Sequence, residues 1–399
     1  GDGARANTSS TVDDASFKLL VPLSASQRLT FRGNAYRELS TVTYSGLTEA
    51  EYAQDPRQTP FVNDGFDITR VGGAVAHRIG RNERRNLTTT LYGYRINRDW
   101  WRQSSNSTQR PNDRNDPSCA GMSNLLTTCG NEGRLREYVV VGIEPRATWQ
   151  WIRSGAIVEV DAGARAHHEA QERQQVNAAS PRGRTIGAPA NVNAGLVEDN
   201  RRTTEAYASY VQTRVATGRL TVSAGVRGEA LRLVRVNRRP APDAPDGVQG
   251  ATTLQALIPG AGATLQLREG LTAFAGVHRG FAPPRPEDII SNSTGGVVEL
   301  DAELSWNSEL GLRWLPARPL RVEATVFNLD FSNQIVPASV AGGVGAALTS
   351  AGRTLHRGAE LSLRAEPMRQ LAGVQLFTEV AAAWTPVARF EGSRFAYIG

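Results

Sequence analysis

The sequence predicts an all-β protein folded as an antiparallel transmembrane β-barrel. The first observation is a two-residue alternation of side chains, clearest over residues 303–314, where Leu310 and Leu312 fall on one face and Glu309 and Arg313 on the other. The second is that the connections between such segments alternate between short and long. The third is length, because many segments reach about ten residues, which a tilted strand needs to cross a bilayer.

The predicted strands repeat this alternation along the chain. In the segment that begins at residue 134, Val139 and Val141 alternate with Arg136 and Tyr138, so one face is apolar and the other is polar or charged. On this pattern we predict about fourteen strands, at residues 17–23, from 28, 67–79, 86–99, from 134, from 156, 203–216, 219–236, 253–267, 271–279, 303–314, 320–331, 354–366 and 374–384.

The connections between these strands predict two different rims. One set is short, such as Arg153 to Gly155 and the two-residue turn Thr217-Gly218. The other set is long and polar, at residues 44–66, 100–133, 167–202, 237–252, 280–301 and 332–353. Outer-membrane barrels have tight periplasmic turns on one rim and longer extracellular loops on the other, which is the order found here.

A soluble β-sandwich or propeller is the alternative, because alternation alone fits either class. Soluble strands average about 5–6 residues, fewer than many segments here. The polar faces also carry charges along their whole length, and a wet lumen tolerates these, whereas an arginine that faces lipid near the midplane would cost about 2–4 kcal/mol. Near strand ends, where aromatic girdles lie, we expect Trp151, Trp314, Phe331 and Trp384.

Composition narrows the class further. The chain has 399 residues and 45 lysines and arginines, of which Lys18 is the only lysine. The arginines are spread over strands and loops without a nucleic-acid-binding motif, so no nucleic-acid partner is expected. No run of 18 apolar residues is present, so no transmembrane helix is predicted. The sequence has no GxSxG, HExxH, P-loop or helix-opening GxGxxG motif, and we do not expect an enzyme.

The two cysteines, Cys119 and Cys129, fall in the same predicted polar connection. Neither belongs to a CxxC motif, and no histidine flanks them at metal-ligand spacing. A disulfide within this connection, in an oxidising compartment, is the interpretation we favour over two free thiols.

Eight motifs lie in order along nearly the whole chain: VTYSGLTEAEY (42–52), DPRQTPFVND (55–64), RDWWRQSSNS (98–107), CGNEGRLREY (129–138), GVHRGFAPPRPED (276–288), ELSWNSELGLR (303–313), FNLDFSNQIVPAS (327–339) and TLHRGAELSL (354–363). On these motifs the chain resembles a TonB-dependent outer-membrane receptor, of the branch of ferric citrate (iron dicitrate) transporters. The resemblance implies a barrel of about 22 strands, plugged by an N-terminal domain. Because the sequence shows no plug, no energy-coupling box and no closing strands, we expect residues 1–399 to be a partial barrel domain.

The resemblance also implies a function. It implies import of a ferric siderophore, with ferric citrate favoured, across the outer membrane of a Gram-negative bacterium. The implied partners are outer-membrane lipid and the inner-membrane TonB complex, which would act through the missing plug region. The iron chelate is the ligand, and no cofactor is expected. The alternatives are a soluble all-β surface or carbohydrate-binding module, a passive outer-membrane porin and a barrel enzyme.

An anionic, oxygen-rich chelate requires arginine forks and hydrogen-bond donors at the extracellular mouth. Residues of this kind at predicted strand tops and in long connections are Arg102, Arg110, Arg134, Arg136, Arg165, Arg201, Arg202, Arg279, Arg285 and Gln334. Each could instead be a solvated charge of the rim or part of a salt bridge between loops. The adjacent histidines His167 and His168 form a poor chelate, because neighbouring strand residues point to opposite faces. His278, near a strand top, could face the lumen.

Overall fold

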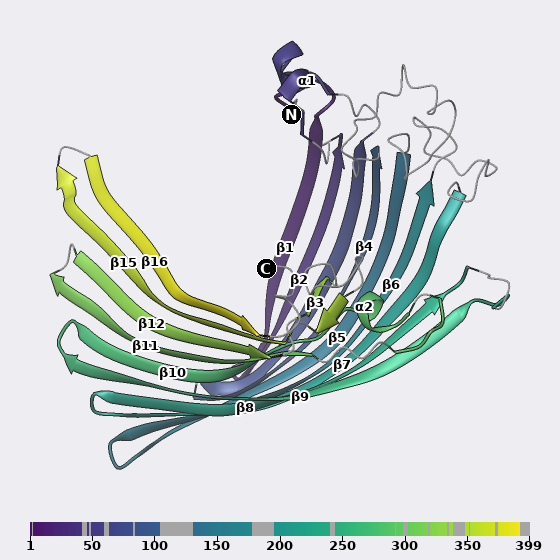
Figure 1. Cartoon of the computed structure of the whole chain (residues 1–399). Coiled ribbons are helices and arrows are strands. Elements are labelled where there is room, and N and C mark those ends of the chain that lie inside the picture. Colours follow the sequence, from purple (N-terminus) through teal and green to yellow (C-terminus); the bar gives the residue numbers. More distant parts are fainter. Residues whose placement is uncertain are drawn as a thin grey trace.

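Fourteen strands form one antiparallel sheet in the computed structural model, and they follow one another across it in chain order (Figure 1). The predicted all-β class and number of strands are therefore confirmed. The structure describes the chain except for residues 2, 42–45, 48, 60–63, 83, 104–130, 178–194, 240–243, 292, 298–301, 318–319, 333–334, 338–347, 351, 372–373 and 392–399.

The sheet begins at β1 and ends at β16, which form its two edges within the described residues. Its strands are β1 Ser10–Ser24, β2 Gln27–Ser40, β3 Gly65–Asn82, β4 Arg85–Gln103, β5 Asn131–Arg153, β6 Ala156–Asn177, β7 Gly195–Thr217, β8 Leu220–Asn237, β9 Val248–Arg268, β10 Leu271–Ala282, β11 Glu303–Ala317, β12 Leu320–Ser332, β15 Arg353–Leu371 and β16 Val374–Glu391. A separate hairpin pairs β13 Ile335–Pro337 with β14 Leu348–Ser350, and two short helices are α1 Glu49–Gln54 and α2 Pro286–Ile289.

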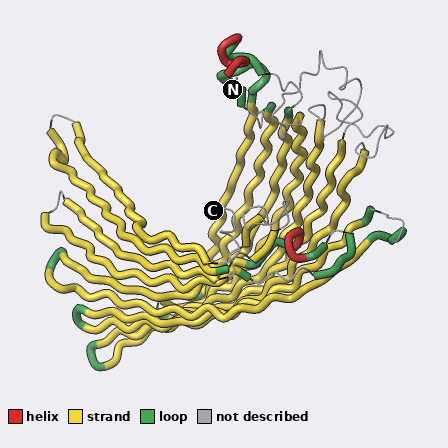
Figure 2. The backbone as a smooth tube through the Cα atoms, viewed as in Figure 1, coloured by secondary structure: helices red, strands yellow, loops and turns green. Residues whose placement is uncertain are grey.

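The connections divide into a short and a long rim, as the sequence predicts (Figure 2). Ser154-Gly155 turns β5 into β6 with positive φ at both residues, the backbone that a type I′ hairpin needs. The predicted turn Thr217-Gly218 is wrong by one residue. Thr217 pairs with Leu220, and Gly218 takes the positive φ of the turn. In the described part of the chain, no helix is both long and apolar enough to cross a membrane.

The strands extend farther toward the long rim than the alternation of apolar residues predicts. β6 continues to Asn177 and β7 begins at Gly195, so most of the predicted connection 167–202 is strand. The physical reason is that ladder hydrogen bonds need only backbone groups. Past the apolar segment both faces of β6 become polar. Apolar alternation therefore ends there, although the ladder of hydrogen bonds continues.

The sheet bends into an open curve, and its two faces differ. α2 lies inside the curve (Figure 1). Ile289 and Ile290 pack there with Leu233 of β8, and Leu254 of β9 lies against them. We call the face of the sheet that carries Leu233 the inner face, and the opposite one the outer face. Side chains alternate along a strand, and paired residues share a face. The register therefore assigns each remaining strand residue to the inner or the outer face.

This register confirms the predicted orientation of the charged and apolar side chains. Glu309 pairs with Gly276, whose partner on β9 is Gly262, and the ladder places all three on the inner face. The leucines next to Glu309 and Arg313 are on the outer face, where Leu310 is 58% exposed. Other large apolar side chains are also open there, including Phe17 at 63% and Trp384 at 69%. An outer face of this kind is what a barrel presents to lipid.

Two of the four aromatic residues expected at girdle positions near strand ends lie at such positions. Trp151 and Trp314 lie near the short rim on the outer face. Phe331 lies near the end of β12 but pairs with Ser305, which places it on the inner face. Trp384 lies in the interior of β16, because this strand continues to Glu391. The expectation of a girdle position is wrong for these last two residues.

Candidate functional site

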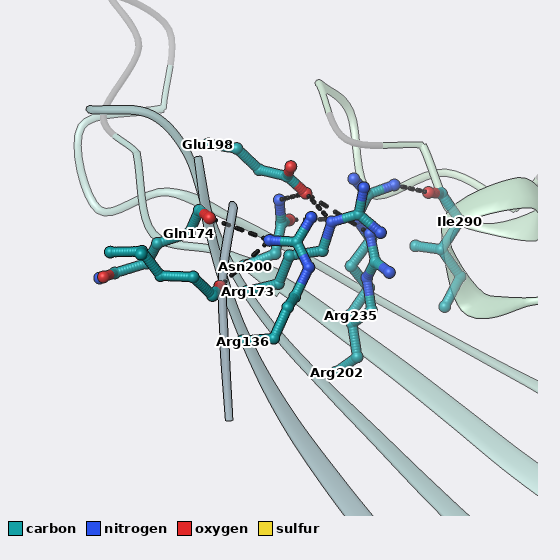
Figure 3. A network of polar contacts seen from close by, with 9 residues as sticks. Arg136, Arg173, Gln174, Glu198, Asn200, Arg202, Arg235 and Ile290 are labelled. Atoms are coloured by element: carbon teal, nitrogen blue, oxygen red, sulfur yellow. Dashed lines mark hydrogen bonds and ion pairs between the residues drawn. The ribbon is translucent and has the colours of Figure 1, made fainter. Parts of the chain in front are cut away.

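Four arginines from four consecutive strands meet on the inner face toward the long rim (Figure 3). Arg136 of β5 is directly opposite Arg173 of β6, and Arg202 of β7 is directly opposite Arg235 of β8. Like charges placed opposite each other destabilise a sheet. The strand register therefore forces positive charge together here, at a cost that negative groups must offset.

Glu198 is the acid at the centre of this group. Its Oε1 lies 2.8 Å from Arg173 Nε and 3.5 Å from Arg202 Nη2. The same oxygen accepts a hydrogen bond of 3.0 Å from Asn200 Nδ2. Among the labelled residues of Figure 3, one carboxylate thus accompanies four guanidinium groups and forms ion pairs with two of them, which leaves these residues with excess positive charge.

The cluster is largely buried, with Arg173 partly exposed, and it is held by neutral acceptors as well as by Glu198. Arg136 Nη1 donates to the carbonyl oxygens of Gln174, at 2.9 Å, and Leu135, at 3.1 Å. Arg136 and Arg202 are only 5% and 3% exposed. Burying charge is expensive unless it is paired and hydrogen-bonded, and these acceptors offset part of that cost.

Arg235 connects the cluster to the long connection that carries α2. Its Nε donates to Asn200 Oδ1 at 3.1 Å, and its Nη1 donates to the carbonyl oxygen of Ile290 at 2.8 Å. Arg235 is 7% exposed, and Asn200 is fully buried. One guanidinium therefore joins β7, β8 and the residue that follows α2, which fixes the wall and the connection relative to each other.

Comparison with known proteins identifies the family. Residues 17–398 match the family model described as "TonB dependent receptor-like, beta-barrel". The chain belongs to the TonB-dependent receptors. The match covers nearly all of the sequence, so the family resemblance of the sequence motifs is confirmed.

Solved structures of several transporters and import receptors share the fold. The ferric citrate transporter FecA in its unliganded form superposes with a TM-score of 0.74 at 18% identity, over 97% of this chain and 53% of that chain. The ferric-catecholate import receptor Fiu from E. coli K12 gives 0.66 at 14% identity, over 97% and 59%. The copper transporter OprC gives 0.63 at 13% identity, over 95% and 54%. This TonB-dependent receptor chain thus spans a little over half the length of these proteins.

The arginines that the sequence singles out lie on both faces of the receptor wall. On the inner face, Arg134 lies two residues from Arg136 along β5, while Arg102 of β4 is buried with its guanidinium carbon 5.2 Å from the Trp100 ring centroid. Arg165 also lies on the inner face, farther from the long rim. Of the predicted residues, Arg136 and Arg202 belong to the cluster.

Arg201 and Arg279 lie on the outer face and are not brought together with the cluster. Arg201 is next to Arg202 in β7, and alternation points it the other way, where its Nε is 3.7 Å from a Glu172 carboxylate oxygen. Arg279 pairs with the outer-face Trp306 and donates to the carbonyl oxygen of Leu257 at 3.4 Å. Arg285 precedes α2 and is exposed.

Several predictions fall outside the described residues, and so they stay predictions. These are the contributions of Arg110 and Gln334 to the site and the disulfide between Cys119 and Cys129. Among the described residues no group of three or more His, Cys, Asp or Glu side chains could hold a metal ion.

The histidines lie within strands. His167 and His168 point to opposite faces, as predicted. His167 Nδ1 lies 2.8 Å from the Tyr92 hydroxyl on the inner face, and His168 is on the outer face opposite Glu205. His278 also lies on the inner face, with Nε2 3.2 Å from Asn307 Nδ2.

Sequence reasoning missed Arg173, Glu198, Asn200 and Arg235. The first three fall in the predicted connection 167–202, and Arg235 lies in a predicted strand beside apolar residues. The available signal was the spacing of Glu198, Asn200 and Arg202, which share one face of an extended segment. That spacing becomes informative only once the segment is known to be a strand.

Proposed function

We propose that this chain forms the barrel wall of an outer-membrane receptor of a Gram-negative bacterium, which imports a ferric siderophore of the ferric citrate type. The observation that carries the proposal is the arginine cluster of Arg136, Arg173, Arg202 and Arg235 on the inner face, with Glu198 as its acid. Citrate-type chelates are anionic and rich in carboxylate oxygens. Arginine binds such oxygens through paired, charge-assisted hydrogen bonds.

The charge of the cluster favours a chelate over a bare cation. Arginine has no lone pair to ligate a metal and is protonated at any physiological pH. Excess positive charge repels an unchelated ion and attracts an anion. In this proposal iron is the cargo, it arrives already held by the siderophore, and the receptor needs no resident cofactor.

Transport itself is proposed from the family. TonB-dependent uptake would draw energy from the inner-membrane TonB complex, acting through a plug domain, which is absent from residues 1–399. The similarity to FecA supports the fold, and the arginine cluster supports an anionic ligand. Arg102, Arg134 and Arg165 line the same inner face and would contribute further positive charge along the ligand's path.

Neighbouring arginines on opposite faces allow a sharp test of this site. Arg202→Gln removes one charge from the cluster, whereas Arg201→Gln removes one from the outer face one residue away. We expect calorimetry with the purified receptor to show ferric citrate binding that is weakened about tenfold or more by Arg202→Gln, because a hydrogen bond to a charged group contributes about 1.5–3 kcal/mol. Arg201→Gln should stay within about twofold of wild type, since it makes no such contact.

Two results would contradict the proposal. One is binding of a different chelate by the wild-type receptor with no heat from ferric citrate. The other is an equal loss of affinity in both variants. Arg136→Lys, which keeps the charge but loses the fork, checks that an effect of Arg202→Gln reflects ligand contact and not failed folding. We expect it to fold as wild type does and to bind the chelate more weakly.

A further inference from the structure

Two arginines on the outer face near the long rim form no ion pair with any acidic residue whose side chain the structure describes. Arg357 of β15 donates through Nε to Asn328 Oδ1 at 2.8 Å, and in the described part of the chain it forms no ion pair. Arg389 of β16 is exposed and forms neither a hydrogen bond nor an ion pair with any described residue. The nearby Asp330 forms an ion pair with Arg353, whose Nε donates to Asp330 Oδ1 at 2.6 Å. Among the described side chains, this corner of the sheet therefore carries more positive than negative charge, with Arg353, Arg357 and Arg389 around Asp330.

The two arginines are close enough to share one anion. Arg357 pairs with Val387, and Leu355 pairs with Arg389, so both arginines belong to the outer face. They are diagonal neighbours on adjacent strands, a separation of about 7–8 Å between Cα atoms. Two flexible guanidinium groups at that spacing can reach a single phosphate group.

An apolar hollow begins directly beside them. It is an open hollow with a volume of about 580 Å³, and its lining includes Ala324, Ala359, Ala382, Leu310, Leu361 and Trp384. Ala359 is two residues from Arg357 along β15, about 7 Å toward the short rim. On β12 the outer face changes in the same direction, from Asn328 to Val326 and Ala324.

We propose that this corner binds one anionic lipid of the leaflet on the side of the long connections. The phosphate would lie on Arg357 and Arg389, and an acyl chain would fill the hollow over Ala359. The occupant follows from charge and shape together, because a free anion satisfies the arginines and leaves the hollow empty, whereas a lipid satisfies both. The outer face of a barrel is also where lipid is in contact with the wall, and arginines near an anionic membrane surface are stabilised by it.

Lipid retention by the purified receptor tests this site. We would mix the detergent-solubilised receptor with phosphatidylglycerol or with phosphatidylcholine of the same acyl chains, and count bound lipids by native mass spectrometry. Wild type should retain phosphatidylglycerol in preference. Arg357→Gln with Arg389→Gln should weaken that retention about fivefold for each arginine. This is the factor that corresponds to about 1 kcal/mol, the binding free energy of one arginine at an anionic membrane surface.

Matched variants separate the two halves of the site. Ala359→Phe fills the hollow and should lower retention of both lipids equally. Arg28→Gln with Arg321→Gln removes two exposed arginines from the inner face and should leave retention unchanged. Inorganic phosphate at the lipid concentration should not displace phosphatidylglycerol. The proposal is overturned if Arg357→Gln with Arg389→Gln retains phosphatidylglycerol as wild type does, if the inner-face pair loses as much, or if inorganic phosphate competes.

Discussion

Aromatic rings in this sheet lie over glycines on the paired strand. Tyr210 is directly opposite Gly163, and Tyr92 is directly opposite Gly142, over which its hydroxyl reaches His167 on the next strand but one. A Cβ added at Gly163 would lie 2.6 Å from Tyr210 Cε1, well inside contact distance. The ring therefore occupies the space that a side chain at Gly163 would fill, and an aromatic ring over a glycine is a known way of stabilising glycine in sheets.

This packing predicts a coupled loss of stability. Gly163→Val should destabilise the folded wall by about 1–3 kcal/mol, because the ring must leave its position. Chemical unfolding in detergent, followed by tryptophan fluorescence, measures the loss. Combining it with Tyr210→Ala should recover part of the stability that the valine costs, since the effects of substitutions at contacting residues on the free energy of unfolding are not additive. Strict additivity of the two substitutions would contradict the contact.

Among the elements, the connection that carries α2 is positioned by the guanidinium of Arg235. Arg235 binds Asn200 on one side and the carbonyl oxygen of Ile290 on the other, while Ile289 and Ile290 bury their side chains against Leu233. The apolar contact holds the connection to the wall, and the arginine fixes its position relative to the cluster. Removing that arginine would leave two buried acceptors without their donor.

We therefore expect Arg235→Ala to loosen this connection. Limited proteolysis should cut residues 283–302 about tenfold faster than in wild type, because loss of a hydrogen bond to a charged group shifts local opening by about 1.5–3 kcal/mol. Arg232→Ala is the matched control, since Arg232 is on the outer face of the same strand, 3.7 Å from Glu205. Equal cleavage rates in the two variants would show that the anchor does not hold the connection.

Some elements can be predicted from the local sequence, and others depend on contacts between distant residues. Alternation of side chains predicts the strands wherever one face is apolar, as in β11 and β15, and predicts the order of short and long connections. It does not predict the outer parts of β6 and β7, where both faces are polar, nor α2, whose position depends on Leu233 and Arg235 of a distant strand. The sequence contains those residues but not their proximity.

At the scale of the whole molecule, the register of the sheet decides what each arginine does. The sequence predicts a binding site of arginines at the strand tops, and its candidates include Arg136 and Arg202 of the cluster. It cannot separate them from Arg201 and Arg279, because one step along a strand exchanges the faces. The same property gives the wall an inner face that collects charge and an outer face that exposes large apolar side chains.

The central claim is that the apolar residues face hydrocarbon and the charged residues face the lumen. Nitroxide labels on single cysteines, introduced after the two native cysteines are replaced by serine, test it in the reconstituted receptor. We predict that labels at Leu310, Leu312 and Leu361 collide with oxygen dissolved in the lipid, and that labels at Glu309, Arg313 and Glu360 collide with a water-soluble nickel complex. The reverse pattern, or no alternation between adjacent positions, would contradict the account.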